Sequence, residues 1–253
     1  MILEIKDLSI SFGGVAAVVD FSMYQEENKI TGIIGPNGAG KTTVFNLITG
    51  IYQADSGKIY YKGRDITKLP AHERTSLGIS RTFQNIRLFN NMSVIDNVKV
   101  PYVVKIRYTI FEEMLKLPRV LREEKSIDDK AREMLGYFGL AGYSNYKPKN
   151  LPYGIQRRLE LARALMAEPE LLLLDEPAAG LNPGEVEELM KLILKIQREK
   201  KLSIIIVEHH MELIMNICSM IHVLDFGKKI AEGTPYEVKK NRKVLQAYLG
   251  DEG

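Results

Sequence analysis

The amino-acid sequence predicts an α/β protein with a mostly parallel sheet, and three observations carry that prediction. After residue 156, helical patterns over 157–167, 185–200 and 211–216 alternate with short strands. Two of those strands, 171–174 and 203–207, are apolar almost throughout, which is typical of parallel strands buried on both faces. An earlier apolar run ends in a glycine-rich turn that opens a helix. Alternating strands and helices imply a mostly parallel sheet covered on both faces.

Strand patterns dominate the N-terminal quarter of the chain. Residues 2–12 alternate in part between apolar and polar, and residues 29–34 form the apolar run that enters the glycine-rich turn. A helical pattern follows from 41 to about 49 and ends at a glycine, as helices commonly do. Residues 57–61 predict a further strand, which ends in a lysine–glycine turn.

The segment from about 94 to 143 contains almost no β pattern. Its charged residues are spaced among leucines as on amphipathic helices, and residues 128–138 show another such pattern. Within one domain spanning the chain, we therefore expect a helical subdomain over about 94–156, inserted into an α/β core formed by 1–93 and 157–253. The alternative is that these helices pack directly on the main sheet.

The C-terminal region adds a small β element to this core. Residues 220–225 and 228–231 predict a hairpin around Gly227, and a short basic helix ends the chain.

The composition excludes several classes of protein. With 253 residues, 45% hydrophobic and 26% charged, the chain can bury a core and is neither a disordered tail nor a disulfide scaffold. The net charge of +3 is too small to indicate nucleic acid. No charge-free apolar run approaches the roughly 18–20 residues of a membrane span, and no apolar signal core follows Met1. The single cysteine, Cys218, is expected to be a small buried hydrophobe, and a cytoplasmic location fits these features.

A phosphate-binding loop is the strongest functional signal. The pattern Gly-x-x-x-x-Gly-Lys-Thr lies between a predicted strand and a predicted helix, which is the context that this motif requires. Glycines let backbone N–H groups turn inward around an anion, and the helix that begins near Lys41 adds its positive end. Lys41 can then reach the β- and γ-phosphates, while the hydroxyl of Thr42 is free to ligate Mg²⁺. The residues expected at the phosphates are Gly35, Pro36, Asn37, Gly38, Ala39, Gly40, Lys41, Thr42 and Thr43.

Two adjacent acids supply the second half of this site. Asp175 and Glu176 follow the buried strand 171–174, and ligands in open α/β sheets gather at the carboxyl ends of strands. We expect Asp175 to hold Mg²⁺, directly or through water, and Glu176 to act as general base on the attacking water. The alternative is that the acids only cap a following helix. No Asn-Lys-x-Asp element for reading guanine occurs, which favours ATP over GTP.

These residues, together with further motifs in a fixed order, resemble the ATP-binding subunits of ABC transporters over essentially the whole chain. The resemblance implies the ABC ATPase fold, a P-loop core with an antiparallel β part at its N-terminus. It implies that Phe12 stacks on adenine, that Ala17 lies at the nucleotide, and that Gln84 senses Mg²⁺ as a further metal ligand and faces the membrane subunit. It also implies that His209 contacts the γ-phosphate. The catalytic residues expected are Glu176, His209, Gln84 and Lys41.

One subgroup of that family is especially similar. The segments 81–89, 92–98, 156–160 and 175–183 resemble the LivG-type ATPases of branched-chain amino-acid importers, as does the ending 247–250. The resemblance implies transmembrane permease subunits, a paralogous ATPase subunit and, indirectly, a substrate-binding protein as partners, with no nucleic acid. It also implies a peripheral place on the cytoplasmic face of the membrane. ATPases of urea importers and lipopolysaccharide exporters are close alternatives.

The signature motif departs from the family pattern of Leu-Ser-Gly-Gly-Gln. Here the segment 151–155 has Pro152 in place of the serine, and proline lacks a backbone N–H to donate. Gly154 remains, and it can approach a phosphate of the partner subunit's nucleotide closely. Asn182 also replaces the usual aspartate of the D-loop, 179–182. We therefore expect two unequal ATP sites, in which a different ATPase subunit supplies the better signature.

Two other functions compete with transport. A soluble ABC ATPase of DNA repair would carry a very long coiled coil between Lys41 and Asp175, and the sequence between them leaves no room for one. A nucleotide-gated scaffold that does not hydrolyse ATP is suggested by Pro152, whereas Glu176 and His209 argue against it.

Overall fold

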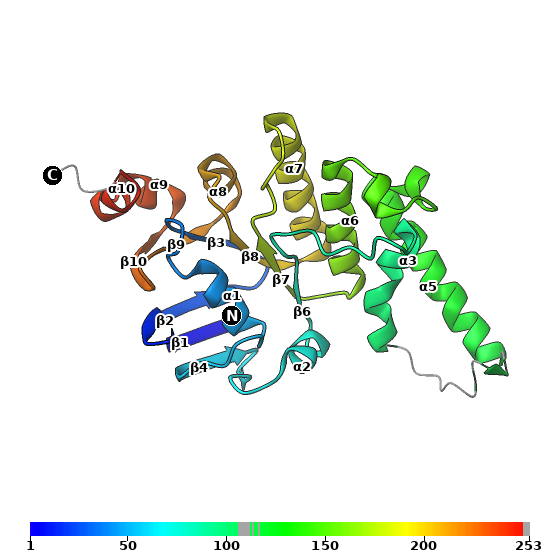
Figure 1. The fold of residues 1–253 in the computed structure, drawn as a ribbon, viewed down its shortest axis with the longest axis horizontal. Coiled ribbons are helices and arrows are strands. Elements are labelled where there is room, and N and C mark those ends of the chain that lie inside the picture. Colours follow the sequence, from blue (N-terminus) through cyan, green and yellow to red (C-terminus); the bar gives the residue numbers. More distant parts are fainter. Residues whose placement is uncertain (106–111, 113, 116, 250–253) are drawn as a thin grey trace. The chain divides into compact units, whose positions relative to one another are not determined.

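The computed structural model describes residues 1–105, 112, 114–115 and 117–249 (Figure 1). Contacts between Cα atoms divide the chain into two compact units, Met1–Gln84 with Glu170–Gly253, and Asn85–Pro169. The second unit is wider than the 94–156 segment expected from the sequence. It includes the residues directly after Gln84 and the whole of α6 (Tyr153–Met166).

The first unit contains a six-stranded sheet that is parallel except at one edge. Strand β9 runs parallel to β3, and β10 closes that edge antiparallel to β9. The apolar strands β7 and β8 are buried at every residue, as expected for parallel strands covered on both faces. In sheet order the strands are β10 (Lys228–Gly233), β9 (Met220–Asp225), β3 (Ile30–Ile34), β8 (Ser203–Val207), β7 (Leu171–Asp175) and β6 (Ile79–Arg81).

A second sheet of the same unit is antiparallel, which confirms the expected antiparallel part at the N-terminus. Its order is β2 (Val15–Gln25), β1 (Leu3–Phe12), β4 (Ser56–Tyr61) and β5 (Arg64–Asp65). Strand β2 was not expected from the sequence. Its pairing with β1 shifts register at several points, and such bulges break the two-residue alternation by which a strand is recognised.

The core of the first unit joins the two sheets through the helix that follows β3. Phe21 of β2 and Phe45 of α1 (Lys41–Ile48) are fully buried in one apolar cluster with Ile33 of β3. The phosphate loop therefore leaves a strand and enters a helix that are both anchored in the same core. The remaining helices of this unit are α2 (Ala71–Ser76), α7 (Pro183–Lys200), α8 (Met211–Ile217), α9 (Pro235–Lys240) and α10 (Arg242–Leu249).

Helix α7 begins two residues before the predicted start at 185, and Asn182 accounts for the difference. The side chain of Asn182 accepts from the backbone N–H of Glu185, and the Glu185 side chain accepts from the N–H of Asn182. This reciprocal pair is a capping box, and Pro183 suits the first helical position. The asparagine that replaces the expected aspartate therefore has a local structural role.

Among its described residues, the second unit is helical. It contains α3 (Val94–Lys99), α5 (Pro118–Tyr137), α6 and three short 3₁₀ segments, η1 (Val100–Lys105), η2 (Ala141–Tyr143) and η3 (Pro148–Asn150). Helix α3 packs against both α5 and α6. Helix α5 includes residues of both the charged stretch before residue 126 and the pattern at 128–138, which were predicted as separate helical patterns. Helix α6 begins four residues before the predicted start at 157. Over the described ranges, no helix is long and apolar enough to cross a membrane.

Candidate nucleotide site

The phosphate loop connects β3 to α1, and two of its glycines have no possible substitute. Gly35 has φ 152°, and a Cβ at this position would lie 2.1 Å from the backbone oxygen of Leu224. Gly40 is the N-cap of α1 with φ 98°, and its Cβ would lie 2.5 Å from the oxygen of Ala17. Backbone approach this close requires glycine. The loop thus has the compact turn that an anion-binding nest needs.

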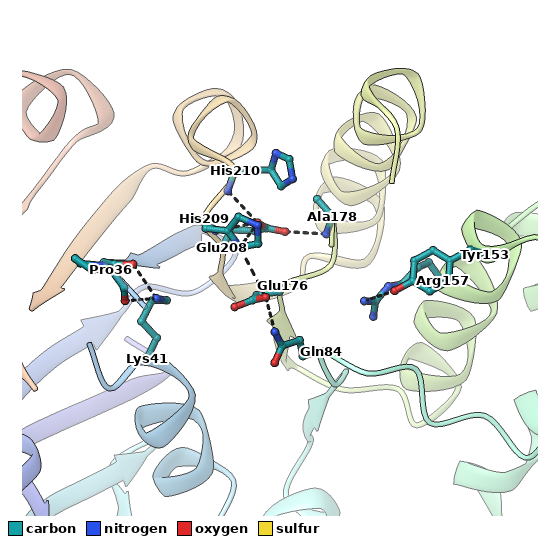
Figure 2. Close-up of polar contacts among 11 residues, drawn as sticks. Pro36, Lys41, Gln84, Tyr153, Arg157, Glu176, Ala178, Glu208, His209 and His210 are labelled. Atoms are coloured by element: carbon teal, nitrogen blue, oxygen red, sulfur yellow. Dashed lines mark hydrogen bonds and ion pairs between the residues drawn. The ribbon is translucent and has the colours of Figure 1, made fainter. Parts of the chain in front are cut away.

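Lys41 lies at the centre of this turn. Its ammonium group donates to the backbone oxygens of Gly35 at 2.7 Å and Pro36 at 2.8 Å (Figure 2). Burial lowers the pKa of Lys41, and the charges of Glu176 and Asp175 oppose that shift. The ammonium is therefore already folded back over the loop that would hold a phosphate, where its donors can exchange carbonyl oxygens for phosphate oxygens.

The rest of the loop is open to ligand. Asn37 and Gly38 are exposed, Ala39 is buried, and Thr42 is exposed in the first turn of α1. Thr43 follows it and is half-buried. The positive end of α1 and these open N–H and hydroxyl groups are suited to binding an anion.

Asp175 ends β7, where it forms a buried ion pair that was not predicted from the sequence. Its Oδ2 lies 2.6 Å from Nη2 of Arg81, whose Nη1 donates to Oδ1 of Asn46 at 2.6 Å. The Arg81 guanidinium also lies over the rings of Phe45 and Phe83. Arg81 ends β6 and pairs with Leu173 of the neighbouring strand β7, two residues before Asp175, so its long side chain can reach the acid.

The other oxygen of Asp175 fits a metal ligand. Within the described residues, Oδ1 is buried and has no hydrogen-bond partner. Buried carboxylate oxygens are normally satisfied, and hard cations such as Mg²⁺ prefer carboxylate and hydroxyl oxygens. Asp175 therefore has an oxygen available for such an ion, and the exposed hydroxyl of Thr42 is chemically suited to join it.

Three of the predicted catalytic residues meet at the carboxyl ends of the parallel strands (Figure 2). Gln84 lies three residues after the end of β6, and Glu176 directly follows β7. His209 is the second residue after β8, and Glu208 lies between them. Nε2 of Gln84 donates to Oε2 of Glu176 at 2.7 Å, and Nδ1 of His209 lies 3.7 Å from the same oxygen. Glu176 also has φ 45°, a strained conformation for a residue with a side chain.

The expected adenine contact lies at the end of β1. Phe12 is 43% exposed and packs edge-on against Tyr52, with ring centroids 5.1 Å apart. Ala17 touches the phosphate loop through its backbone, since its oxygen limits the space at Gly40. The Tyr52 partner was not recognised from the sequence.

The signature position belongs to the second unit. Pro152 is the exposed N-cap of α6 and makes no side-chain cap. The hydroxyl of Tyr153, the first helical residue, accepts from Nη2 of Arg157 at 2.9 Å. Gly154 lies half-buried in the first turn of α6. Its contact with a nucleotide in the partner subunit stays a prediction.

Two further buried charged residues, Arg74 and Glu208, were not predicted because, like Arg81, they contact residues distant in the sequence. Arg74 donates to four backbone oxygens, including those of Leu47 and Ile48 at the end of α1, and burial lowers its pKa to about 10. Glu208 is fully buried and accepts from backbone N–H groups of two loops. Such contacts join residues far apart in the sequence and leave no local pattern.

Comparisons with known proteins identify the family of the chain. The family model described as ABC transporter matches residues 18–179, and the model described as branched-chain amino acid ATP-binding cassette transporter matches residues 228–253. The chain is 42% identical to the high-affinity branched-chain amino acid transport ATP-binding protein LivG of Salmonella typhimurium, over 99% of this chain and 98% of the relative. It is 35% identical to the lipopolysaccharide export system ATP-binding protein LptB of Haemophilus influenzae, over 99% and 98% respectively.

A solved structure leads to the same family. MJ1267, an ATP-binding cassette of an ABC transporter, superposes with a TM-score of 0.86 at 30% identity, covering 98% of this chain and 99% of that one. The match includes the fold as well as the sequence, and the motifs described above lie at the expected ends of strands. The chain therefore belongs to the ABC transporter family, as one of its ATP-binding proteins.

Proposed function

We propose that this chain is the ATP-hydrolysing subunit of an importer for branched-chain amino acids. Two findings favour this substrate class over lipopolysaccharide export. Identity is 42% with LivG against 35% with LptB, and the model matched by the C-terminal residues is specific to branched-chain amino acid transporters. ATP hydrolysis itself follows from membership of the family. No observation favours a urea importer.

The phosphate loop is the part that binds the nucleotide in this proposal. Backbone N–H groups between Gly35 and Thr43 surround the phosphates, and Lys41 moves its donors from the oxygens of Gly35 and Pro36 to the β- and γ-phosphates. Phe12, which already presents an exposed ring, stacks on the adenine.

The metal side of the site is formed by Thr42, Asp175 and Gln84. The free oxygen of Asp175 and the open hydroxyl of Thr42 are the chemically suited ligands, and the side-chain oxygen of Gln84 is the third. When bound, Mg²⁺ would neutralise charge on the β- and γ-phosphates. Arg81 meanwhile holds the second oxygen of Asp175, which orients the carboxylate.

The convergence of Gln84, Glu176 and His209 is the observation that carries the hydrolytic assignment. Glu176 accepts the proton of the attacking water, as a carboxylate suitably placed at the reacting group can. Its position is held by the amide of Gln84 at 2.7 Å, and His209 lies beside it with an exposed ring that can reach the γ-phosphate. Gln84 thus contacts the base directly and also lies at the last residue of the first unit, which suits a sensor of the permease.

The proposed assembly contains two ATPase subunits that sandwich two ATP molecules. One site uses the phosphate loop of this chain with the signature of a paralogous subunit. The other uses Pro152 and Gly154 of this chain and is weaker, because Pro152 offers neither a hydroxyl nor an N–H to the γ-phosphate. The assembly docks on permease subunits at the cytoplasmic face of the membrane, and a binding protein delivers the amino acid.

The test is purification of the tagged chain from native membranes in mild detergent, with partners identified by mass spectrometry. We expect two polytopic permeases and a second ATPase, with a binding protein whose affinity for leucine, isoleucine and valine can be measured directly. A single kind of membrane protein, or a binding protein that prefers urea, would overturn the proposed importer. Neither outcome would bear on ATP hydrolysis, which is measured separately as the ATPase activity of the purified assembly.

A further inference from the structure

Glu208 lies between two loops, one carrying Glu176, the proposed base, and the other carrying His209. It is the first residue after β8, it is fully buried, and both of its carboxylate oxygens are engaged (Figure 2). Oε1 accepts from the N–H of Ala178 at 2.7 Å, and Oε2 accepts from the N–H groups of His209 at 2.9 Å and His210 at 3.1 Å. Hydrogen bonds to an ionised acceptor are among the stronger ones in proteins.

We infer that Glu208 is a positioning residue for ATP hydrolysis, which fixes the loop of Glu176 and the loop of His209 in one arrangement. The inference rests on the proposed roles of Glu176 and His209. It assigns Glu208 no contact with the nucleotide, because the carboxylate is buried and both oxygens are occupied by backbone donors.

The sheet brings the two loops side by side. Strands β7 and β8 are parallel neighbours in which Asp175 pairs with Val207, so Glu176 and Glu208 leave the sheet at the same level. The N–H of Glu176 also donates to the oxygen of Val207 at 2.8 Å. Among the described residues, the pairing of β7 with β8 ends at this point, and the carboxylate of Glu208 connects the two loops that follow.

On one side, Glu208 supports the strained conformation of Glu176. The residue has φ 45°, and the turn behind it is closed by a bond from the N–H of Ala179 to the oxygen of Glu176 at 3.1 Å. The N–H of Ala178, inside that turn, is held by Glu208. A residue in a sparsely populated backbone conformation persists only where its surroundings hold it, and Glu208 supplies part of that restraint.

On the other side, Glu208 orients the loop of His209 and His210. Two consecutive N–H groups, of His209 and His210, point at the same oxygen, and His210 is the N-cap of α8. The ring of His209 thereby lies with Nδ1 at 3.7 Å from Glu176. Small displacements of catalytic groups are costly to turnover, so loss of this carboxylate should reach the chemistry through both loops.

A glutamate, rather than a residue of the same shape, is required because all three partners are donors. In Glu208→Gln the amide has one acceptor oxygen, and its NH₂ group must face either Ala178 or the two histidine N–H groups. One loop therefore loses its anchor while the volume of the side chain is unchanged.

The experiment uses the full assembly and measures turnover, KM, ATP affinity and melting temperature. For Glu208→Gln we expect turnover to fall roughly ten- to hundredfold, with the dissociation constant for ATP within about twofold of the parent. In a His209→Ala background, the same substitution should cost a factor at least about three times smaller, because one of the two positioned groups is already absent. Equal factors in both backgrounds, or a parallel loss of ATP affinity, would overturn the inference.

A matched control is available in Glu237→Gln. Glu237 also accepts a backbone N–H, from Thr234 at 2.7 Å, but in the capping box of α9 and away from the catalytic loops. We expect its turnover to be unchanged, and a loss as large as that of Glu208→Gln would mean that general destabilisation explains both. If Glu208→Gln does not fold, Glu208→Asp retains the charge, shortens the reach by one methylene and enters the same cycle.

Failure of this inference is distinguishable from failure of the proposed site. Loss of turnover in Glu176→Gln and His209→Ala, together with normal turnover in Glu208→Gln, would overturn the inference alone. Normal turnover in Glu176→Gln and His209→Ala would overturn their assigned roles, and the positioning role of Glu208 with them.

Discussion

The phosphate loop and the signature segment are both helix N-termini, yet they differ in the residues that surround the start of the helix. Helix α1 begins after Gly40. The left-handed backbone conformation of Gly40 turns the loop back on itself, and Lys41 lies inside that turn. Helix α6 begins after Pro152, which has no N–H, and its first side chain is engaged by Arg157. Both helices have a positive end. The comparison teaches that the dipole alone does not make a phosphate site and that the surrounding donors decide.

The largest effect should come from Glu176, the proposed base. We expect Glu176→Gln to lower turnover by roughly 10²–10⁴ while ATP still binds, since the amide cannot accept the proton. Phosphate release by the assembly, measured next to nucleotide affinity, separates the two effects. Turnover close to that of the parent would contradict the assignment of Glu176 as the base. The phosphate loop would then no longer be distinguished from the signature segment by a catalytic residue beside it.

A smaller loss is expected for Lys41→Ala, which removes the charged donor of the loop. Hydrogen bonds to charged groups contribute about 1.5–3 kcal/mol, so ATP affinity should fall roughly ten- to 150-fold. Equilibrium binding of a fluorescent ATP analogue gives the value, with Lys191→Ala on the exposed face of α7 as control. An unaltered affinity would contradict the assignment of this loop.

Phe12→Ala should weaken ATP binding by about 1–3 kcal/mol, because a base stacked on an aromatic ring gains that much. The same variant should weaken GTP binding to a similar degree, since stacking is tolerant of the base. Tyr236→Ala, at a ring of α9 that is 68% exposed, is the matched control. Equal behaviour of the two variants would place the adenine elsewhere.

The smallest effect should come from restoring a donor at the signature. We expect Pro152→Ser to raise turnover of the assembly a fewfold, because a hydroxyl and an N–H return at the N-cap of α6. The substitution also suits the cap position, so the melting temperature should not fall. A loss of turnover would mean that the proline is favourable at this site. The N-terminus of α6 would then contact a phosphate productively without the missing donors, as the N-terminus of α1 is proposed to do with its own.

Much of the fold could be predicted because parallel strands leave a local pattern. The predicted strands at 203–207 and 220–225 coincide with β8 and β9. Strand β2 was missed because its bulges disturb the alternation. The charged stretch before residue 126 and the pattern over 128–138 were predicted as separate helical patterns, whereas α5 is one continuous helix. A charged face still forms a helix when the opposite face packs on neighbours, as α5 does on α3.

The candidate site was predictable where a motif is contiguous and unpredictable where contacts span the fold. The loop from Gly35 to Thr43 and the pair Asp175 and Glu176 are short patterns with a chemical reason. Arg74 and Glu208 instead serve backbone groups 27 and 30 positions away, at Leu47 and Ala178. Nothing in their own neighbourhoods indicates those partners.

The lone cysteine has a practical consequence. Cys218 is 7% exposed, and its sulfur packs so closely on β3 that a Cβ at Gly32 would lie 3.1 Å from it. Burial raises the pKa of its thiol, so the reactive thiolate is scarce until the core opens. The rate at which an alkylating reagent modifies Cys218 in the native chain therefore measures how often the structure around β3, the strand that leads into the phosphate loop, opens locally. Bound nucleotide should slow this alkylation, and the native cysteine reports the effect without an engineered probe.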